Sequence, residues 1–325
     1  MVARYCILTD CTLSCAPVMS LLTDHIKLLR PKDWAKNLFL FVPSFFAGNL
    51  DVSRIGMLTL GFISFSFLAS CIYIINDYRD IDDDRKHPVK QNRPLASGRV
   101  KKPTAVAICF ILFVVSLTLA YFLDPTLQLL FIMGIYFVVN FSYSMGLKNI
   151  AILDILLLAS GFVLRVKAGA IIAHVDTSEW LIIMTYLLAL FMAIAKRRDD
   201  MLLKISTGAD MRKSITGYNL DFLNTMLGLF SAIIIVAYIM YTVWDITVIR
   251  MGTHRLYYTS VFVMAGLMRY LQITFVVGKS GSPTEILYKD RFIQVTLVLW
   301  VLSFYVILYL RGKSFFPPRM STFLE

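Results

Sequence analysis

Charged residues are scarce in this sequence: only 16% of its 325 residues are Asp, Glu, Lys or Arg, whereas 58% are hydrophobic. A soluble globular chain carries about 25% charged residues, so the composition argues against an ordinary soluble enzyme and predicts an integral membrane protein. The five cysteines lack the paired C-x-x-C spacing of a metal site, and the four histidines are scattered. The sequence therefore predicts no disulfide framework, no structural zinc and no histidine-rich metal site.

The glycine-rich loops of nucleotide-binding proteins are absent as well. The chain contains neither G-x-G-x-x-G nor the G-x-S-x-G of a nucleophile elbow. Gly278-Lys279-Ser280 matches the end of a P-loop, but Ile273 stands where the first glycine belongs. These absences exclude the common nucleotide-binding and serine-hydrolase motifs.

What the chain has in abundance is apolar segments of the length that crosses a bilayer, about 20 residues each. We predict an all-α integral membrane protein of about nine transmembrane helices. Residues 1–26 are interpreted as an N-terminal tail, whose residues 1–18 are either an over-long start or a disordered segment, and residues 27–325 as one membrane domain. The predicted helices are 36–50, 55–75, 104–123, 127–145, 150–173, 179–196, 222–243, 257–277 and 292–311.

The net charge of +11 is distributed unevenly among the loops. Lys and Arg concentrate in the loops 77–103, 197–221 and 278–291, which all lie on one side of the membrane in a nine-helix arrangement. The positive-inside rule makes that side cytoplasmic and predicts that the N-terminus is inside and the C-terminus outside. The same bias accounts for most of the positive charge without a nucleic-acid partner.

An acidic motif follows the second predicted helix: Asn76-Asp77-x-x-Asp80-x-x-x-Asp84. At about 100° per residue, the three carboxylates fall within roughly 60° of one another on a helix. Such stacking is costly unless a cation neutralises it, and Mg²⁺ prefers oxygen ligands. We predict that Asp77, Asp80 and Asp84 are catalytic residues that hold Mg²⁺, with Asn76 beside them. The alternative is a solvated acidic cap.

Basic and polar residues near the predicted cytoplasmic ends of the helices are candidates for binding substrate phosphates, because Arg and Lys both suit phosphate oxygens. For several of them the alternative is plain positive-inside charge, an interfacial anchor or, for Arg165, a bridge to another helix. Asp154, an intramembrane carboxylate, is a further catalytic candidate. The binding candidates besides Asn76 are Lys36, Arg85, Lys90, Arg93, Tyr143, Lys148, Arg165, Lys196 and Arg197. Arg269 is interpreted as structural.

Taken together, these segments resemble the UbiA prenyltransferase superfamily and, within it, the decaprenyl-phosphate phosphoribosyltransferase branch. The acidic motif marks the superfamily, and the segments around Tyr143 and Lys196 point to the branch. The resemblance extends over most of the chain from about residue 27. It rests on Arg30-Pro31, Trp34, Lys36-Asn37, Asn76-Asp77 to Asp84, His87-Pro88, Lys90, Arg93-Pro94, Tyr143-Ser144, Leu147-Lys148, Asp154, Gly161 to Arg165, Lys196-Arg197, Pro283 to Glu285 and Lys289 to Arg291.

The resemblance implies a UbiA-like helical bundle in a prokaryotic plasma (inner) membrane, with its active site facing the cytoplasm. It implies Mg²⁺-dependent transfer of 5-phosphoribose from phosphoribosyl diphosphate to a polyprenyl phosphate, which releases diphosphate and supplies a lipid-linked sugar for envelope glycan. Asp154 would then orient the ribose hydroxyls. The sequence leaves the oligomeric state open, homo-oligomers included.

Two alternatives remain. One is a UbiA-type prenyltransferase that moves a prenyl group from a prenyl diphosphate to an aromatic or lipid acceptor. The superfamily's second motif, D-x-x-x-D, is replaced here by Lys196-Arg197-Arg198-Asp199-Asp200, which argues against an aromatic acceptor. The other is a transporter, which is disfavoured because the acidic residues cluster at the cytoplasmic edge and not at the midplane.

Overall fold

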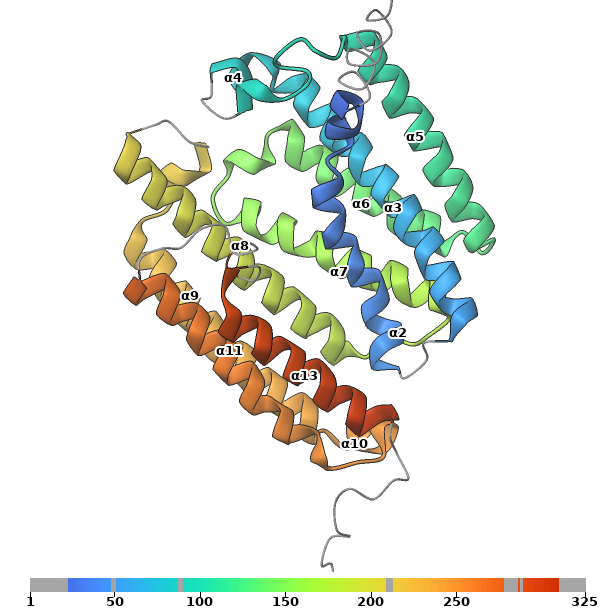
Figure 1. The fold of residues 1–325 in the computed structure, drawn as a ribbon, viewed down its shortest axis with the longest axis vertical. Helices are drawn as coiled ribbons and strands as arrows, with labels where there is room; N and C mark the ends of the chain where they lie inside the picture. Colours follow the sequence, from blue (N-terminus) through green and yellow to red (C-terminus); the bar gives the residue numbers. More distant parts are fainter. Residues whose placement is uncertain are drawn as a thin grey trace, which may run out of the picture. The chain divides into compact units, whose positions relative to one another are not determined.

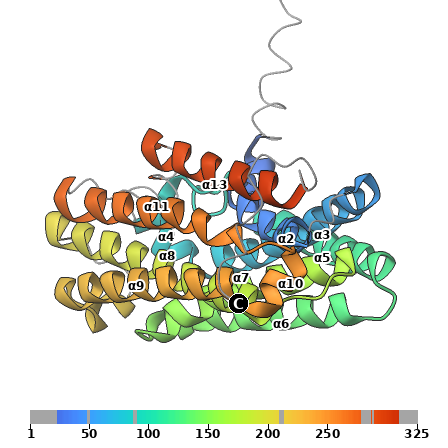
Figure 2. The same ribbon diagram turned by 90° about the horizontal axis from the view of Figure 1, so that it is seen from below.

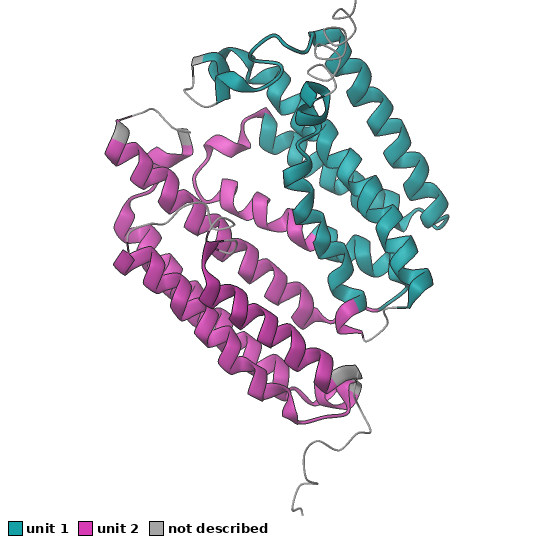
Figure 3. Ribbon diagram, in the orientation of Figure 1, with its two compact units in different colours: residues 1–44, 50–144, 164–175 teal, residues 45–49, 145–163, 176–325 magenta. Residues whose placement is uncertain are grey.

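The structure is a computed structural model that describes residues 23–47, 51–86, 90–208, 213–277, 286 and 289–309. Most of the tail and the motif segments His87-Pro88 and Pro283–Glu285 lie outside these ranges. Within them every regular element is a helix, which confirms the predicted all-α class. The chain divides into two compact units, coloured separately in Figure 3, and each is described by itself.

Unit 1 contains residues 1–44, 50–144 and 164–175. Figure 1 labels its main helices, which run from the N-terminal segment to α6 and include the second part of α7. Its elements are η1 (Pro31–Phe41), the start of α2 (Val42–Phe46), α3 (Val52–Arg79), α4 (Ile81–Lys86), η2 (Lys90–Asn92), α5 (Lys102–Leu123), α6 (Gln128–Met145) and the later part of α7 (Leu153–Ala173).

Unit 2 contains residues 45–49, 145–163 and 176–325. In Figures 1 and 2 its helices α8 and α9 run side by side, as do α11 and α13. Its elements, besides the first part of α7, are η3 (Leu147–Asn149), α8 (Glu179–Thr207), η4 (Lys213–Gly217), α9 (Leu220–Val243), α10 (Asp245–Met251), η5 (Arg255–Thr259), α11 (Ser260–Gln272), η6 (Ile273–Val277) and α13 (Arg291–Tyr309).

Seven helices of the described residues are long and apolar enough to cross a membrane. They fall on the predicted segments from 55–75 to 257–277, so the integral membrane character is confirmed. The first predicted segment is a 3₁₀ helix, η1, followed by the short α2, and the last is an apolar helix over Arg291–Ile307. The count of nine spans and the N-inside orientation stay predictions.

Small polar residues let α3 and α5 pack closely in unit 1. Ser64 Oγ donates to the carbonyl of Ser116 at 2.8 Å, and Ser116 Oγ donates back to the carbonyl of Ser64 at 2.7 Å. Seven residues further along α3, Cys71 Sγ lies 3.2 Å from the carbonyl oxygen of Cys109, seven residues earlier on α5. The pairing shows two antiparallel helices in register, and small side chains are what such close approach requires.

The 3₁₀ helix η1 is fixed against α3 by two polar contacts. Trp34 Nε1 donates to Ser70 Oγ at 3.1 Å, and Asn37 Nδ2 donates to Ser66 Oγ at 2.9 Å. Pro31 occupies its first turn, where the fixed φ of proline suits the start of a helix. The second part of α7 also packs on η1, because a Cβ at Gly169 would lie 1.9 Å from the carbonyl oxygen of Leu40.

We therefore expect Gly169→Ala to destabilise the protein, by about 2 kcal/mol or more, because the methyl group meets rigid backbone and overpacking costs about 1–3 kcal/mol. Gly228→Ala on α9 is the matched control, since nothing lies within 4 Å of a Cβ there; it should be neutral or stabilising by up to about 1 kcal/mol. Thermal unfolding in detergent measures both. Equal melting temperatures for the two variants would contradict the close contact.

Candidate active site

Two arginines and two aspartates form a buried ion cluster in unit 1, which we call the Asp77 cluster: Arg30, Asp77, Asp84 and Arg93. Arg30 Nη2 pairs with Asp77 Oδ1, and Arg93 Nη1 lies 3.1 Å from Asp77 Oδ1 and 2.6 Å from Asp84 Oδ2. Only 2% of Asp77 and 3% of Asp84 is exposed. Two carboxylates thus converge on a single cationic nitrogen.

The acidic motif is carried by two helices and not by one continuous helix face, which corrects the sequence interpretation. α3 ends at Arg79, Asp80 adopts φ −90° and ψ 12°, and α4 begins at Ile81. The backbone N–H of Asp80 still donates to Asn76 and that of Asp84 to Asp80, so the chain keeps a helical path. Asp77 and Asp84 therefore reach the same arginine, while Asn76 and Asp80 are half-buried beside them.

Burial and pairing act in opposite directions on the charges of this cluster. Burial raises the pKa of Asp84, and the nearby Arg93 charge only partly offsets it. Burial alone would lower the pKa of Arg30, but the Asp77 charge and their hydrogen bond raise it. Ionising Asp84 therefore costs free energy, and a further cation near its carboxylate would reduce that cost.

The donor set fits a hard divalent cation. Asp77 and Asp84 offer carboxylate oxygens that already share one cation position, with the oxygens of Asn76 and Asp80 on the same segment. Among the residues that the structure describes, no three His, Cys, Asp or Glu side chains are grouped closely enough to form a complete metal site. Mg²⁺ does not require one, because it commonly takes one or two carboxylates plus substrate phosphates.

The other candidate cations near this motif, Arg85, Lys36 and Lys90, differ in their exposure and in their hydrogen-bond or ion-pair partners. Arg85 is exposed and donates to the carbonyl of Ala96 at 3.1 Å, so it holds the following loop. Lys36 pairs with Asp33 at 2.6 Å on η1 and is half-buried, as is Lys90. The structure thus brings Arg93 into the cluster by direct contact, and the charge of Lys90 also acts on Asp84.

Unit 2 holds a second ion cluster, the Asp154 cluster: Asp154, Arg197, Asp200 and Tyr218. Arg197 Nε lies 2.7 Å from Asp154 Oδ2, and its Nη1 lies 2.5 Å from Asp200 Oδ2. The Tyr218 hydroxyl donates to Asp154 Oδ1 at 2.7 Å. Asp154 and Arg197 are both 0% exposed, so each is committed to the other and not to solvent.

Arg165 bridges helices within unit 1, as one of its two sequence interpretations anticipated. Its Nε donates to Asn37 Oδ1 at 2.7 Å and its Nη2 to the Tyr136 hydroxyl at 2.8 Å. Asn37 in turn donates to Ser66. The guanidinium therefore ties η1, α6, α7 and α3 together through hydrogen bonds.

Of the remaining candidates, Lys196 is exposed, whereas Tyr143 and Lys148 are half-buried. Lys148 lies in η3, between the end of α6 and the start of α7. Arg269 pairs with Asp290 at 2.8 Å, and its structural interpretation stays a prediction.

Sequence reasoning missed Tyr218 altogether and included Arg30 only among the residues of the family resemblance. Arg30 meets Asp77 across 47 positions of sequence and Tyr218 meets Asp154 across 64. No local motif marks Tyr218, whereas the Arg30-Pro31 segment was a signal by which Arg30 could have been found.

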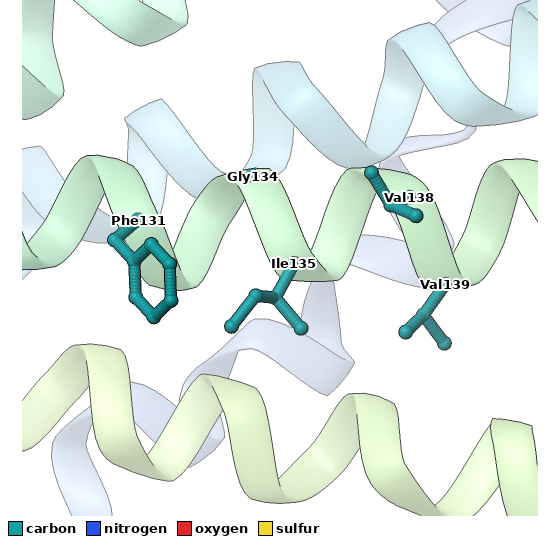
Figure 4. Close-up of a pocket in the computed structure, with 5 residues that line it drawn as sticks. All are labelled: Phe131, Gly134, Ile135, Val138 and Val139. Carbon is teal, nitrogen blue, oxygen red and sulfur yellow. The ribbon is translucent and has the colours of Figure 1, made fainter.

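A shallow groove on α6 contains no residue of either ion cluster. Figure 4 shows the residues that line it, which all belong to this helix: Phe131, Gly134, Ile135, Val138 and Val139. The lining is wholly apolar, as a lipid-facing surface is, and it offers no group that would recognise a phosphate.

Comparison with known sequences gives relatives of nearly full length. Decaprenyl-phosphate phosphoribosyltransferase of Mycolicibacterium smegmatis is 31% identical over 296 residues, which are 88% of this chain and 92% of that protein. The protein of the same name from Corynebacterium glutamicum is 29% identical over 299 residues, 90% of this chain and 89% of the relative.

The fold has solved counterparts. A UbiA homolog from Archaeoglobus fulgidus, whose structure was determined bound to GPP and Mg²⁺, superposes with a TM-score of 0.65 over 88% of this chain and 99% of that one, at 20% identity. The model of the UbiA prenyltransferase family matches residues 37–209. This range is more than half of the sequence and includes Asp77 on α3 and Arg197 on α8. The chain therefore belongs to the UbiA prenyltransferase family.

Proposed function

We propose that this protein transfers 5-phosphoribose from phosphoribosyl diphosphate to a polyprenyl phosphate of the decaprenyl type and releases diphosphate. The observation that carries the proposal is the convergence of Asp77 and Asp84 on one cation position, which suits the metal complex of a diphosphate. The nature of the transferred group rests on the nearly full-length relatives that bear this name.

Asp77 and Asp84 would hold Mg²⁺, with Asp80 and Asn76 beside them. The bound ion would supply Lewis-acid charge to the leaving diphosphate. Arg30 and Arg93 pair with the two carboxylates and orient them. Arg93, with Lys90 nearby in sequence, adds positive charge where the diphosphate develops charge. The bond from C1 of the ribose to the diphosphate oxygen breaks, and a bond from C1 to a phosphate oxygen of the lipid forms.

The lipid phosphate is already ionised, so no strong general base is required. Lys148 and Lys196 are proposed to bind it, because both are cations that retain exposure to solvent. Arg197 and Asp154 are buried against each other, so we assign them to positioning and not to direct contact with the ribose hydroxyls. Tyr143, at the end of α6, is proposed to line the same region as Lys148.

The membrane setting follows from the charge distribution. We propose an N-inside, C-outside orientation in a prokaryotic plasma membrane, so that both water-soluble phosphoribosyl diphosphate and the lipid phosphate meet at the cytoplasmic face. The product would be a lipid-linked sugar phosphate for envelope glycan.

The direct test is purified protein in detergent with Mg²⁺, labelled phosphoribosyl diphosphate and decaprenyl phosphate. We expect label in the lipid phase and its loss when EDTA removes the metal. Transfer from a prenyl diphosphate to an aromatic acceptor, without phosphoribosyl transfer, would instead establish the prenyltransferase alternative. Inactivity in both assays would refute the proposed transfer.

Neutralising a carboxylate of the Asp77 cluster should abolish most of this activity. We expect Asp77→Asn and Asp84→Asn each to lower kcat on the order of 100-fold or more, the magnitude of losing a group that stabilises developing charge. Asp82→Asn is the matched control, since the Asp82 side chain is 89% exposed on the same short helix. An equal loss in all three variants would show a general charge effect.

Arg165, in contrast, should matter for stability and not for substrate binding. Arg165→Lys keeps the charge but cannot reach both Asn37 and Tyr136, and we expect a loss of about 2 kcal/mol, the range for hydrogen bonds to a charged group. The folded variant should keep its KM values within about twofold of the native protein. Lys167→Arg, an exposed position on the same helix, is the reciprocal control; a selective KM increase in Arg165→Lys would assign Arg165 to the substrate.

A further inference from the structure

The Tyr218 hydroxyl makes two hydrogen bonds at the start of α7. It donates to Asp154 Oδ1 at 2.7 Å and accepts the backbone N–H of Ile152. From this geometry we propose that Tyr218 is a positioning residue for the phosphoribosyl transfer. It fixes the turn between η3, which carries Lys148, and the start of α7, which carries Asp154, the buried partner of Arg197. The inference rests on the proposed function and adds a residue that no motif of the sequence marks.

The turn that Tyr218 holds is strained. Ile152 has φ +70°, a left-handed conformation that is a genuine outlier for a β-branched residue. Such strain persists only where the surroundings over-determine it. The carbonyl of Ile152 accepts bonds from Ile155 and Leu156 in the first turn of α7, and its N–H is satisfied by Tyr218. The helix therefore fixes the carbonyl group of Ile152, and the tyrosine fixes its N–H group.

Close packing brings the tyrosine to this position. A Cβ at Gly217 would lie 2.5 Å from Cβ of Ala151, so η4 rests directly on the strained turn. The Tyr218 ring stacks on Phe222, with centroids 6.1 Å apart and an interplanar angle of 23°. Only 7% of Tyr218 is exposed. Removal of the hydroxyl alone would leave this packing intact and break only the two hydrogen bonds.

The hydroxyl can act on the phosphate-binding region by two routes. One runs through Asp154 to Arg197 and on to Asp200, which lies about one turn along α8 from the exposed Lys196. The other runs through Ile152 to η3, which carries Lys148. Burial and the hydrogen bond to Asp154 raise the pKa of Tyr218, so the phenol stays protonated and remains a donor.

The first test asks whether the hydroxyl holds the turn, without any substrate. Tyr218→Phe should speed hydrogen exchange of a peptide covering residues 146–156, because the Ile152 N–H loses its acceptor. Tyr238→Phe is the matched control, because its hydroxyl is also buried and also has two partners, Thr259 and Trp300. Tyr238 lies near the end of α9, whereas Tyr218 lies just before its start. Unchanged exchange in Tyr218→Phe would overturn the proposal.

The second test asks whether the turn matters for transfer. We expect kcat of Tyr218→Phe to fall about tenfold to 100-fold with both KM values changed less than about threefold, since small misplacements of reacting groups cost up to about 100-fold. Tyr238→Phe should keep the native kcat. In the Asp154→Asn background, Tyr218→Phe should cost little more, because residues that act as one unit are non-additive.

Additive losses in that double variant, or a native kcat in Tyr218→Phe, would refute the positioning role. The proposed function can fail separately: native protein that transfers no phosphoribose contradicts that proposal whatever Tyr218 does. Faster exchange in Tyr218→Phe would then still show the hydroxyl bond, but a positioning role in this reaction would be excluded.

Discussion

The cost of removing a charge from water governs this molecule more than any other constraint. An ion in a low-dielectric interior is tolerated only when it is paired and its remaining hydrogen-bonding capacity is used. Each unit meets this requirement where a long apolar segment ends. The Asp77 cluster follows the apolar part of α3 in unit 1, and the Asp154 cluster joins the start of α7 to the residues after the apolar part of α8 in unit 2. The guanidinium of Arg165 donates hydrogen bonds to the neutral side chains of Asn37 and Tyr136. The helices can therefore stay apolar along most of their length.

This constraint separates residues that look alike in the sequence. Lys196 and Arg197 are neighbours in a basic run, yet Lys196 is exposed and Arg197 is wholly buried between two carboxylates. On the proposed function, Lys196 would bind a substrate phosphate, whereas removing a partner of Arg197 would leave an uncompensated buried charge. The basic run would thus combine a residue that binds substrate with a residue that holds it in place.

Hydrophobic pattern and local motif were sufficient to predict the helical segments and to select Asp77 and Asp84, which the structure brings to one arginine. Both features are local in sequence, since a span is a continuous run and the acidic motif occupies nine residues. The break at Asp80 was not predicted, because helical periodicity continues through it. The partners Arg30 and Tyr218 lie 47 and 64 residues from their aspartates, and such pairs depend on packing that a single sequence does not reveal. The metal site and the remaining site residues stay predictions.

The net charge of the Asp77 cluster determines whether a metal would bind there alone or together with a diphosphate. Two aspartates and two arginines sum to zero, so a divalent cation by itself would introduce two uncompensated positive charges beside Arg93. A diphosphate carries the negative charge that removes this excess, and it offers Arg93 new acceptors in place of Asp77 and Asp84. On the proposed function, the cluster is therefore suited to receive the metal and the diphosphate together. The arginines would then pair with the carboxylates before the substrate binds and with the leaving group afterwards, which Arg, with its five donors, can do without leaving the site.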